Sequence, residues 1–88
     1  MKIALFFVEY SNIEDIIDLI SQIEDNNISF YVWCNGRSDK SKELERFANV
    51  YYSQDNIGYI NPFIILSKKI WNLNYDFHIL ANSDIKID

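Results

Sequence analysis

Apolar and polar positions follow two periods along this chain, one typical of strands and the other of helices. The first apolar run, residues 3–8, is uninterrupted, as in strands that are buried on both faces of a parallel sheet. Residues 28–34 are rich in β-branched and aromatic side chains, which favour strands. Two shorter runs, residues 50–52 and 77–81, are also rich in such side chains. The predicted strands are residues 3–8, 28–34, 50–52 and 77–81.

Helical spacing of apolar residues predicts the segments between these strands. Isoleucines from position 13 to position 23 form the apolar stripe of an amphipathic helix. A short helix is expected at about residues 40–47. Asn61 followed by Pro62 predicts the start of a third helix, with asparagine as the N-cap and proline at the first helical position. The predicted apolar face of this helix consists of Phe63, Leu66, Ile70 and Leu73.

The elements therefore alternate in the order βαβαβαβ. This alternation predicts a parallel sheet of about four strands, joined by right-handed crossovers that place helices on its faces. We expect an α/β fold of the Rossmann-like type, a three-layer α/β/α half domain. The 88 residues suffice for one domain at most, so residues 1–88 form a single predicted domain.

Polar loops follow each predicted strand. Ligands of open α/β sheets bind outside the carboxyl ends of the strands, and these ends share one edge when the strands are parallel. The loops expected at this edge are residues 9–12, 34–39, 54–59 and 82–84.

Composition narrows the classes of function. The net charge is −5 and the eight Lys and Arg residues are scattered, which argues against a nucleic-acid partner. A negative surface is also a poor match for an anionic membrane. The single cysteine excludes an internal disulfide framework and fits a reducing compartment. Because the apolar N-terminal run is too short for a signal sequence or a membrane span, we expect a cytoplasmic protein, or one held peripherally at the inner face of the membrane.

Four polar segments at the strand ends carry the candidate chemistry. Residues 8–15 read Val-Glu-Tyr-Ser-Asn-Ile-Glu-Asp, and residues 34–41 read Cys-Asn-Gly-Arg-Ser-Asp-Lys-Ser. Residues 56–59 read Asn-Ile-Gly-Tyr, and residues 80–85 read Leu-Ala-Asn-Ser-Asp-Ile. In this order and at this spacing the segments resemble the nucleotide-binding half of family-2-type glycosyltransferases. The resemblance extends over nearly the whole chain, and the last segment is similar to that family's form of the Asp-x-Asp motif.

The resemblance implies a GT-A-type site for a nucleotide-diphosphate sugar of the UDP or dTDP type. Asp84 matches the carboxylate that binds a divalent cation, Mg²⁺ or Mn²⁺, both of which take oxygen ligands. Tyr10 would offer its ring to the base, and Gly58 would let the backbone approach the nucleotide closely. The implied nucleotide-binding residues are Tyr10, Asn35, Asn56, Gly58 and Asn82.

The sequence departs from the family at three positions, one of which is Ser11, where asparagine is usual. Cys34 stands where the family often has an acidic residue that accepts a hydrogen bond from the base, and Glu9 stands where threonine is usual. The family's catalytic base and acceptor-binding segment lie downstream of the Asp-x-Asp motif, and four residues follow Asp84. We therefore expect no catalytic residue in this chain. Sugar transfer to a glycan or other acceptor, as in polysaccharide biosynthesis, is expected only of a complete enzyme, and the isolated chain is expected to be inactive.

Two other functions fit the same sequence. One is a non-catalytic remnant or nucleotide-binding module that keeps the half-fold without turnover. The other is a small interaction domain that self-associates through the apolar surface which a half-fold leaves exposed. Some residues have simple packing interpretations beside the functional ones. Cys34 is expected as a small buried hydrophobe, His78 as a packed or edge residue, and Trp33 and Trp71 as core or helix-packing residues.

Overall fold

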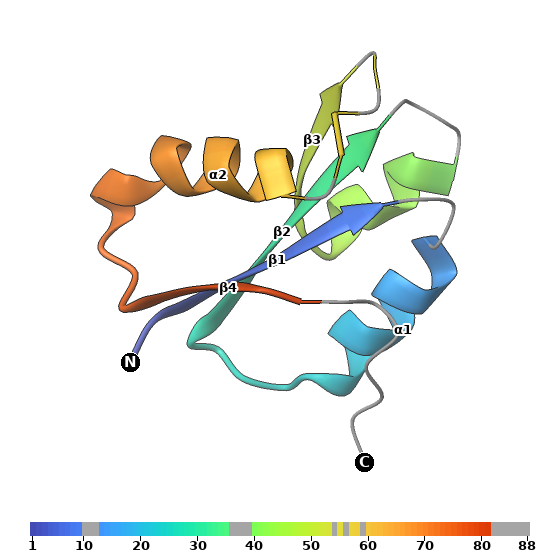
Figure 1. Ribbon diagram of the computed structural model, residues 1–88. Helices are drawn as coiled ribbons and strands as arrows, with labels where there is room; N and C mark the ends of the chain where they lie inside the picture. The colour runs from blue at the N-terminus through green and yellow to red at the C-terminus, as the bar shows by residue number, and fades with distance from the viewer. Residues whose placement is uncertain (10–12, 36–39, 54, 56, 59, 82–88) are drawn as a thin grey trace.

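The computed structural model describes residues 1–9, 13–35, 40–53, 55, 57–58 and 60–81. Four strands form one sheet in the order β3-β2-β1-β4 (Figure 1). Each strand is parallel to its neighbours, which confirms the parallel sheet predicted from the alternating elements. The strands are β1 (Ile3–Glu9), β2 (Ile28–Asn35), β3 (Asn49–Ser53) and β4 (Phe77–Leu80).

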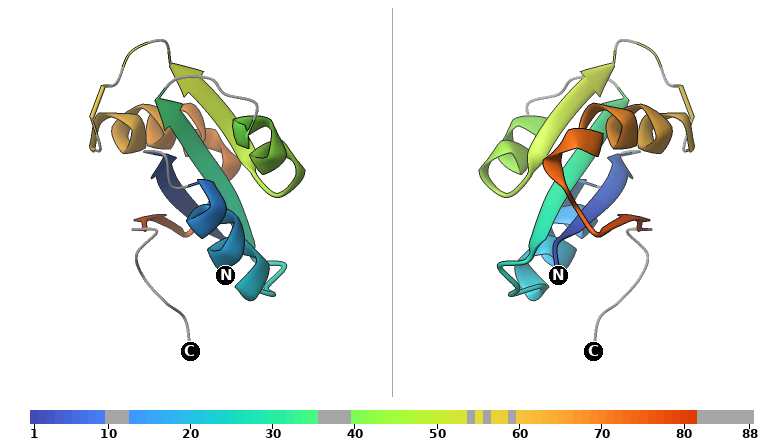
Figure 2. Two further views of the ribbon diagram at one scale, coloured as in Figure 1. Left: turned by 90° about the vertical axis from the view of Figure 1, so that its right-hand side faces the viewer. Right: turned by 90° about the vertical axis from the view of Figure 1, so that its left-hand side faces the viewer.

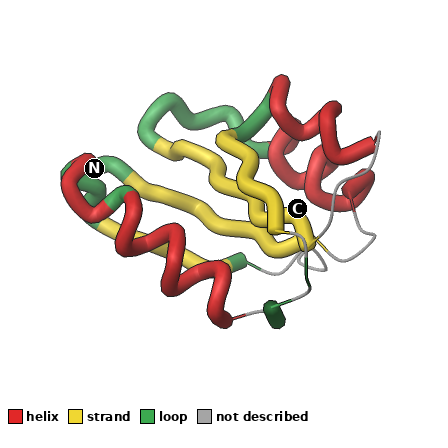
Figure 3. Tube along the Cα trace, turned by 90° about the horizontal axis from the view of Figure 1, so that it is seen from above, coloured by secondary structure: helices red, strands yellow, loops and turns green. Residues whose placement is uncertain are grey.

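Helices cover both faces of the sheet, so the domain has the expected three layers. The views of Figures 2 and 3 show the sheet between two sets of helices. On one face lie α1 (Ile13–Gln22) and η1 (Lys40–Arg46), a 3-10 helix. On the other lie α2 (Ile60–Lys69) and the short 3-10 helix η2 (Trp71–Leu73). The result is a small α/β/α unit of the Rossmann-like type.

Alternation of side chains along β1 and β2 divides the apolar residues between two cores. Successive residues of a strand point to opposite faces of the sheet, so the neighbours Phe6 and Phe7 are buried on different sides. We name the two clusters by the helix that covers them. The α1-side core consists of Phe7, Ile13, Ile16, Leu19, Ile20, Val32, Cys34 and Leu44, and the α2-side core of Ala4, Phe6, Tyr31, Trp33, Leu66 and Ile70.

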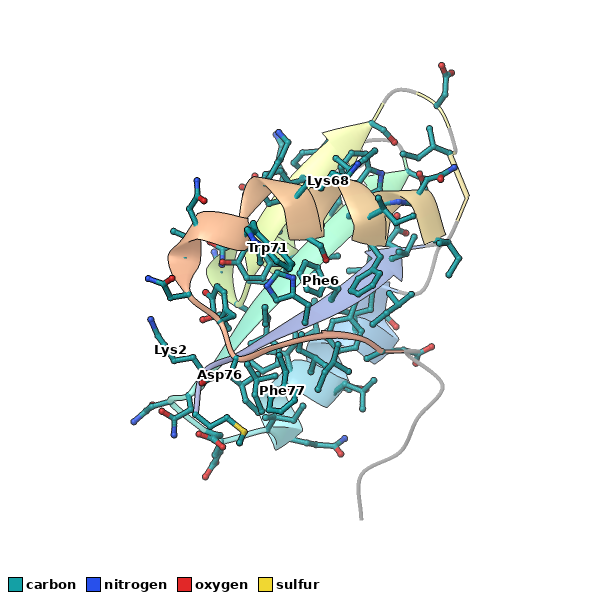
Figure 4. All side chains as sticks on the ribbon, turned by 60° about the vertical axis from the view of Figure 1, so that its left-hand side comes forward. Lys2, Phe6, Lys68, Trp71, Asp76 and Phe77 are labelled. Carbon is teal, nitrogen blue, oxygen red and sulfur yellow. The ribbon has the colours of Figure 1, made fainter. Side chains whose placement is uncertain are left out.

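Phe6 is the centre of an aromatic group in the α2-side core. Its ring is stacked on Tyr31 at a centroid distance of 5.4 Å and meets the edge of Phe63 at 5.1 Å. The imidazole of His78 lies 5.6 Å from the same ring. Figure 4 shows Phe6 beneath α2, with Trp71 above it. Because these rings come from β1, β2, α2 and β4, the group ties the sheet to the helix that covers it.

The start of α2 differs from the sequence prediction. The helix begins at Ile60, so Asn61 lies in its first turn and is not the N-cap. The side-chain amide of Asn61 instead donates a hydrogen bond to the carbonyl oxygen of Ile57, at 3.1 Å. Asparagine therefore stabilises the entry into the helix from inside the first turn, by bonding back to the preceding segment.

The end of α2 also differs. Leu66 and Ile70 are buried as predicted, but the α-helix ends at Lys69 and the chain continues into η2. Leu73, which helical spacing placed on the apolar face, is 51% exposed. Trp71, expected as a core or helix-packing residue, is 73% exposed and meets the His78 ring at a centroid distance of 5.8 Å. A 3-10 turn has three residues per turn, and this change of period removes Leu73 from the apolar stripe.

We expect Leu66→Ala to lower the free energy of unfolding by about 2–5 kcal/mol, because the leucine is almost fully buried against the sheet and its truncation leaves a cavity. The measurement is urea unfolding followed by circular dichroism. Ile65→Ala is the matched control, since Ile65 precedes Leu66 on the same helix and is 36% exposed. Equal losses in the two variants would contradict the packing described here.

Candidate functional site

The strand order reverses at β1. From β1 the chain steps to β2 and then to β3 on one side, whereas β4 lies on the opposite side of β1. In open parallel sheets the crevice outside the carboxyl ends of the two strands at such a reversal is the usual place for a ligand. Here those strands are β1, which ends at Glu9, and β4, which ends at Leu80. The backbone N–H of Ala81 donates to the carbonyl of Phe6 at 2.8 Å and holds the two strands together near this edge.

Most of the residues predicted for the site lie outside the described residues. These are Tyr10, Asn56, Asn82 and Asp84. In the sequence, Tyr10 directly follows β1, while Asn82 and Asp84 follow β4, the two strands that flank the reversal. Asn35 and Gly58 are described, and the structure brings these two predicted residues together.

Asn35 joins the end of β2 to the loop that follows β3. Its side-chain carbonyl accepts a hydrogen bond from the backbone N–H of Ile57 at 3.3 Å. Its amide nitrogen lies 3.5 Å from the carbonyl oxygen of Gly58, a long and weak hydrogen bond. One side chain thus satisfies backbone groups at two neighbouring positions, and it fixes the loop against the carboxyl end of β2.

Ser53, which no sequence motif indicated, extends this connection. The indole N–H of Trp33 donates to the Ser53 hydroxyl oxygen at 3.1 Å. The hydroxyl proton has two acceptors in reach, Asn35 Oδ1 at 3.3 Å and the carbonyl oxygen of Asp55 at 2.7 Å. Its position is the feature that could have indicated it, because Ser53 directly follows the predicted third strand. In the sheet it is the parallel partner of Asn35.

Gly58 has a backbone conformation that requires glycine. Its φ is +94°, a region that residues with a Cβ rarely adopt. A Cβ at this position would have no described heavy atom within 4 Å, so crowding by the described residues does not explain the glycine. With this φ, the carbonyl oxygen of Gly58 lies 3.5 Å from the side-chain nitrogen of Asn35.

Cys34 faces away from Asn35 and has the packing role expected from the sequence. It is fully buried in the α1-side core. Burial, together with the nearby carboxylates of Glu9 and Glu45, raises the pKa of its thiol from 9.0 to about 12, and burial is the largest of these causes. The thiol is therefore protonated at neutral pH, which makes it a poor nucleophile. It also cannot replace a carboxylate that accepts a hydrogen bond from a base.

The described residues alone do not form a metal site. Among residues 1–9, 13–35, 40–53, 55, 57–58 and 60–81, no three His, Cys, Asp or Glu side chains gather closely enough to hold an ion. Glu9 is the carboxylate at the end of β1, and it is only 9% exposed. A cation at this edge would therefore depend on Asp84, which lies outside the described residues, and the metal site stays a prediction.

A hollow lies away from the carboxyl edge, between α2, η2 and the start of β4. It has a volume of about 430 Å³, and Figure 4 shows Trp71 and Phe77 on either side of β4 near it. Two buried polar atoms on its walls, Ser67 Oγ and His78 Nδ1, have no hydrogen-bond partner among the described residues. The His78 ring packs against aromatic neighbours, in line with the packing role expected of it. The lining residues are Phe63, Ser67, Trp71, Tyr75, Asp76, Phe77 and His78.

Comparisons with protein-family models, with curated proteins and with solved structures find no match to this chain. In the part of the chain that the structure describes, the helices are too short or too polar for any of them to cross a bilayer.

We expect the free energy of unfolding to fall as the pH rises above 9, because the raised pKa of Cys34 favours the protonated thiol in the folded state only. Below pH 9 the thiol is protonated in both states and its contribution is complete. Between pH 9 and 12 the unfolded chain ionises first, which costs roughly 1–2 kcal/mol by about pH 10.5. The measurement is urea unfolding of the native chain and of Cys34→Ala at several pH values.

In Cys34→Ala the free energy of unfolding should fall less between pH 9 and pH 10.5 than in the native chain. Burial also raises the pKa of Tyr31 and of Tyr52, so a decline from the tyrosines remains in both proteins. The informative quantity is the difference between the two pH profiles. Parallel profiles from pH 7 to pH 10.5 would show that Cys34 does not titrate as its burial implies.

Proposed function

We propose that this chain is the nucleotide-binding half of a family-2-type glycosyltransferase. In a complete enzyme of this kind, a sugar would pass from a nucleotide-diphosphate donor of the UDP or dTDP type to a glycan or other acceptor. Two features support the proposal. The four motif segments occur in the family's order, and they follow the strands of a parallel sheet whose order reverses at β1. A cytoplasmic location belongs to the same proposal and is consistent with a single, buried, unpaired cysteine.

The contact between Asn35 and the loop at Gly58 is the observation that carries the proposal. Asn35 belongs to the second motif segment and Gly58 to the third, 23 positions later. The side chain of Asn35 meets this loop at the carboxyl end of β2, the strand next to β1. Residues singled out separately by resemblance are therefore in contact at the edge where open α/β sheets bind ligands.

Each predicted residue has a distinct task in this proposal. Asn35 holds the loop of Gly58 in position, and Tyr10 provides an aromatic face for the base. Asp84 and Asn82 supply oxygen atoms beside the end of β4, of the kind that Mg²⁺ and Mn²⁺ prefer. When bound, the cation would neutralise negative charge on the diphosphate.

A nucleotide-binding module without turnover is the second candidate. Two features of the described residues favour it. The buried Cys34 cannot accept a hydrogen bond in place of a carboxylate, and Glu9 places a carboxylate at the end of β1, near the proposed position of an anionic ligand. Both features would weaken recognition of the donor. Hydrolysis or transfer of a sugar from UDP-sugars by the purified chain would exclude this second candidate.

Titration calorimetry with UDP tests the proposed donor site. We expect UDP to bind in the presence of Mn²⁺ and to bind about tenfold more weakly with EDTA, because the cation neutralises the diphosphate. Asp84→Asn should remove this dependence on metal. Asn35→Ala should weaken binding by roughly three- to tenfold, because it removes the acceptor that holds the Ile57 N–H.

Asp18→Asn is the control for Asp84→Asn. It makes the same change in charge on an exposed position of α1, away from the carboxyl edge, and should leave UDP binding unchanged. Absence of any heat at millimolar UDP, with and without Mn²⁺, would overturn the donor site. Equal weakening by the two aspartate variants would reduce it to a general effect of net charge.

A further inference from the structure

The outer edge of β4 is open in the described part of the chain. β4 is the last strand in the sheet order and pairs with β1 along its other edge. Its sequence is Phe-His-Ile-Leu, without Lys, Glu or Pro. Natural edge strands usually carry such residues, or a bulge, because these prevent pairing with another chain. β4 therefore lacks the common side-chain protection of an edge strand.

The backbone of β4 presents hydrogen-bonding groups outward at two positions. The N–H groups of Phe77 and Ala81 point inward, where they donate to Lys2 at 3.3 Å and to Phe6 at 2.8 Å. In a strand this direction alternates with each residue. The N–H and C=O groups of His78 and Leu80 therefore point away from β1, and they are placed symmetrically about Ile79.

The side chains beside this edge are apolar and exposed. Phe77 is 50% exposed and Ile79 is 43% exposed. Both lie on the face of α1, because their partners on β1 are Ile3 and Leu5. The buried residues of the α1-side core come from β1, β2, α1 and η1, so this face of β4 is left without a covering helix among the described elements (Figure 2).

We propose that a second copy of this chain pairs with the open edge of β4, antiparallel, about a two-fold axis through Ile79. In this register His78 of each copy exchanges two hydrogen bonds with Leu80 of the other, so that all outward groups of both residues are used. Ile79 lies opposite its own copy, at a Cα–Cα distance of about 4.5 Å. The Phe77 rings reach across the diagonal to Ile79, a favourable aromatic and β-branched pair.

The open edge of β4 is suited to pairing with a second copy of the same strand. The outward groups are symmetrical about one residue, and the strand has no charge that would meet a like charge in its copy. An isologous contact of this kind closes on itself, which yields a dimer and not an open chain. The two-fold axis is perpendicular to the sheet, so it keeps both α1 helices on one face. The exposed Phe77 and Ile79 of the two copies then form one shared apolar cluster.

The first test measures mass against concentration by analytical ultracentrifugation. The mass should rise from the 10.5 kDa of the chain towards twice that value as the concentration increases. Ile79→Lys should weaken the association by roughly tenfold or more, because it places two like charges directly opposite each other. Ile65→Lys should leave it unchanged. Ile65 is 36% exposed and lies one helical turn before Lys69, whose Nζ is 5.5 Å from the Tyr51 ring of β3, at the far edge of the sheet.

The second test is disulfide formation and keeps the proposal testable if Ile79→Lys fails to fold. Ile79→Cys should form a covalent dimer under mild oxidation, because the expected Cα–Cα distance of about 4.5 Å permits a disulfide. Ile65→Cys should remain largely monomeric, and the buried Cys34 should not react in either variant. A chain that stays monomeric at every concentration would overturn the proposal, as would equal cross-linking of the two cysteine variants or equal weakening by the two lysine variants.

Discussion

β1 must be paired along both edges and covered on both faces, and the other elements are placed by this requirement. Its uninterrupted apolar run puts Phe6 and Phe7 on opposite sides of the sheet, where each would expose a large ring without a helix above it. α2 covers the first and α1 the second. With β2 on one edge and β4 on the other, the polar residue at the end of β1 comes to lie at the point where the strand order reverses.

The fold could be predicted because its signals are local. Uninterrupted apolar runs, β-branched residues and helical stripes each arise within about ten residues, and they yield the element order and the parallel sheet. The errors fall where a polar residue keeps strand geometry, as at Asn35 and Ser53, or where the helical period changes, as at Trp71. At Asn35 and Ser53 the hydrogen-bond partners lie elsewhere in the chain. Ser53, for example, bonds to Asn35, its register partner on β2.

The sequence predicts candidate site residues one by one but not the contacts between them. Resemblance identified Asn35 and Gly58 separately, whereas their meeting depends on the register of β2 against β3 and on the positive φ at Gly58. The hydrogen bond from Trp33 to Ser53 joins residues 20 positions apart, and no local sequence pattern predicts it. Cys34 shows the limit of resemblance, because the position that resemblance matches to a carboxylate holds a side chain that points into the α1-side core.

The late position of β4 in the sequence affects how the chain is made. Ile3 is paired with Phe77, so the sheet on this side of β1 cannot close until β4 has emerged from the ribosome. Until then the ring of Phe6 lacks the imidazole of His78, which later packs against it. Contacts between distant segments are slow to form. The nascent protein therefore passes through a period in which its central strand is available to chaperones or to unfolded neighbours.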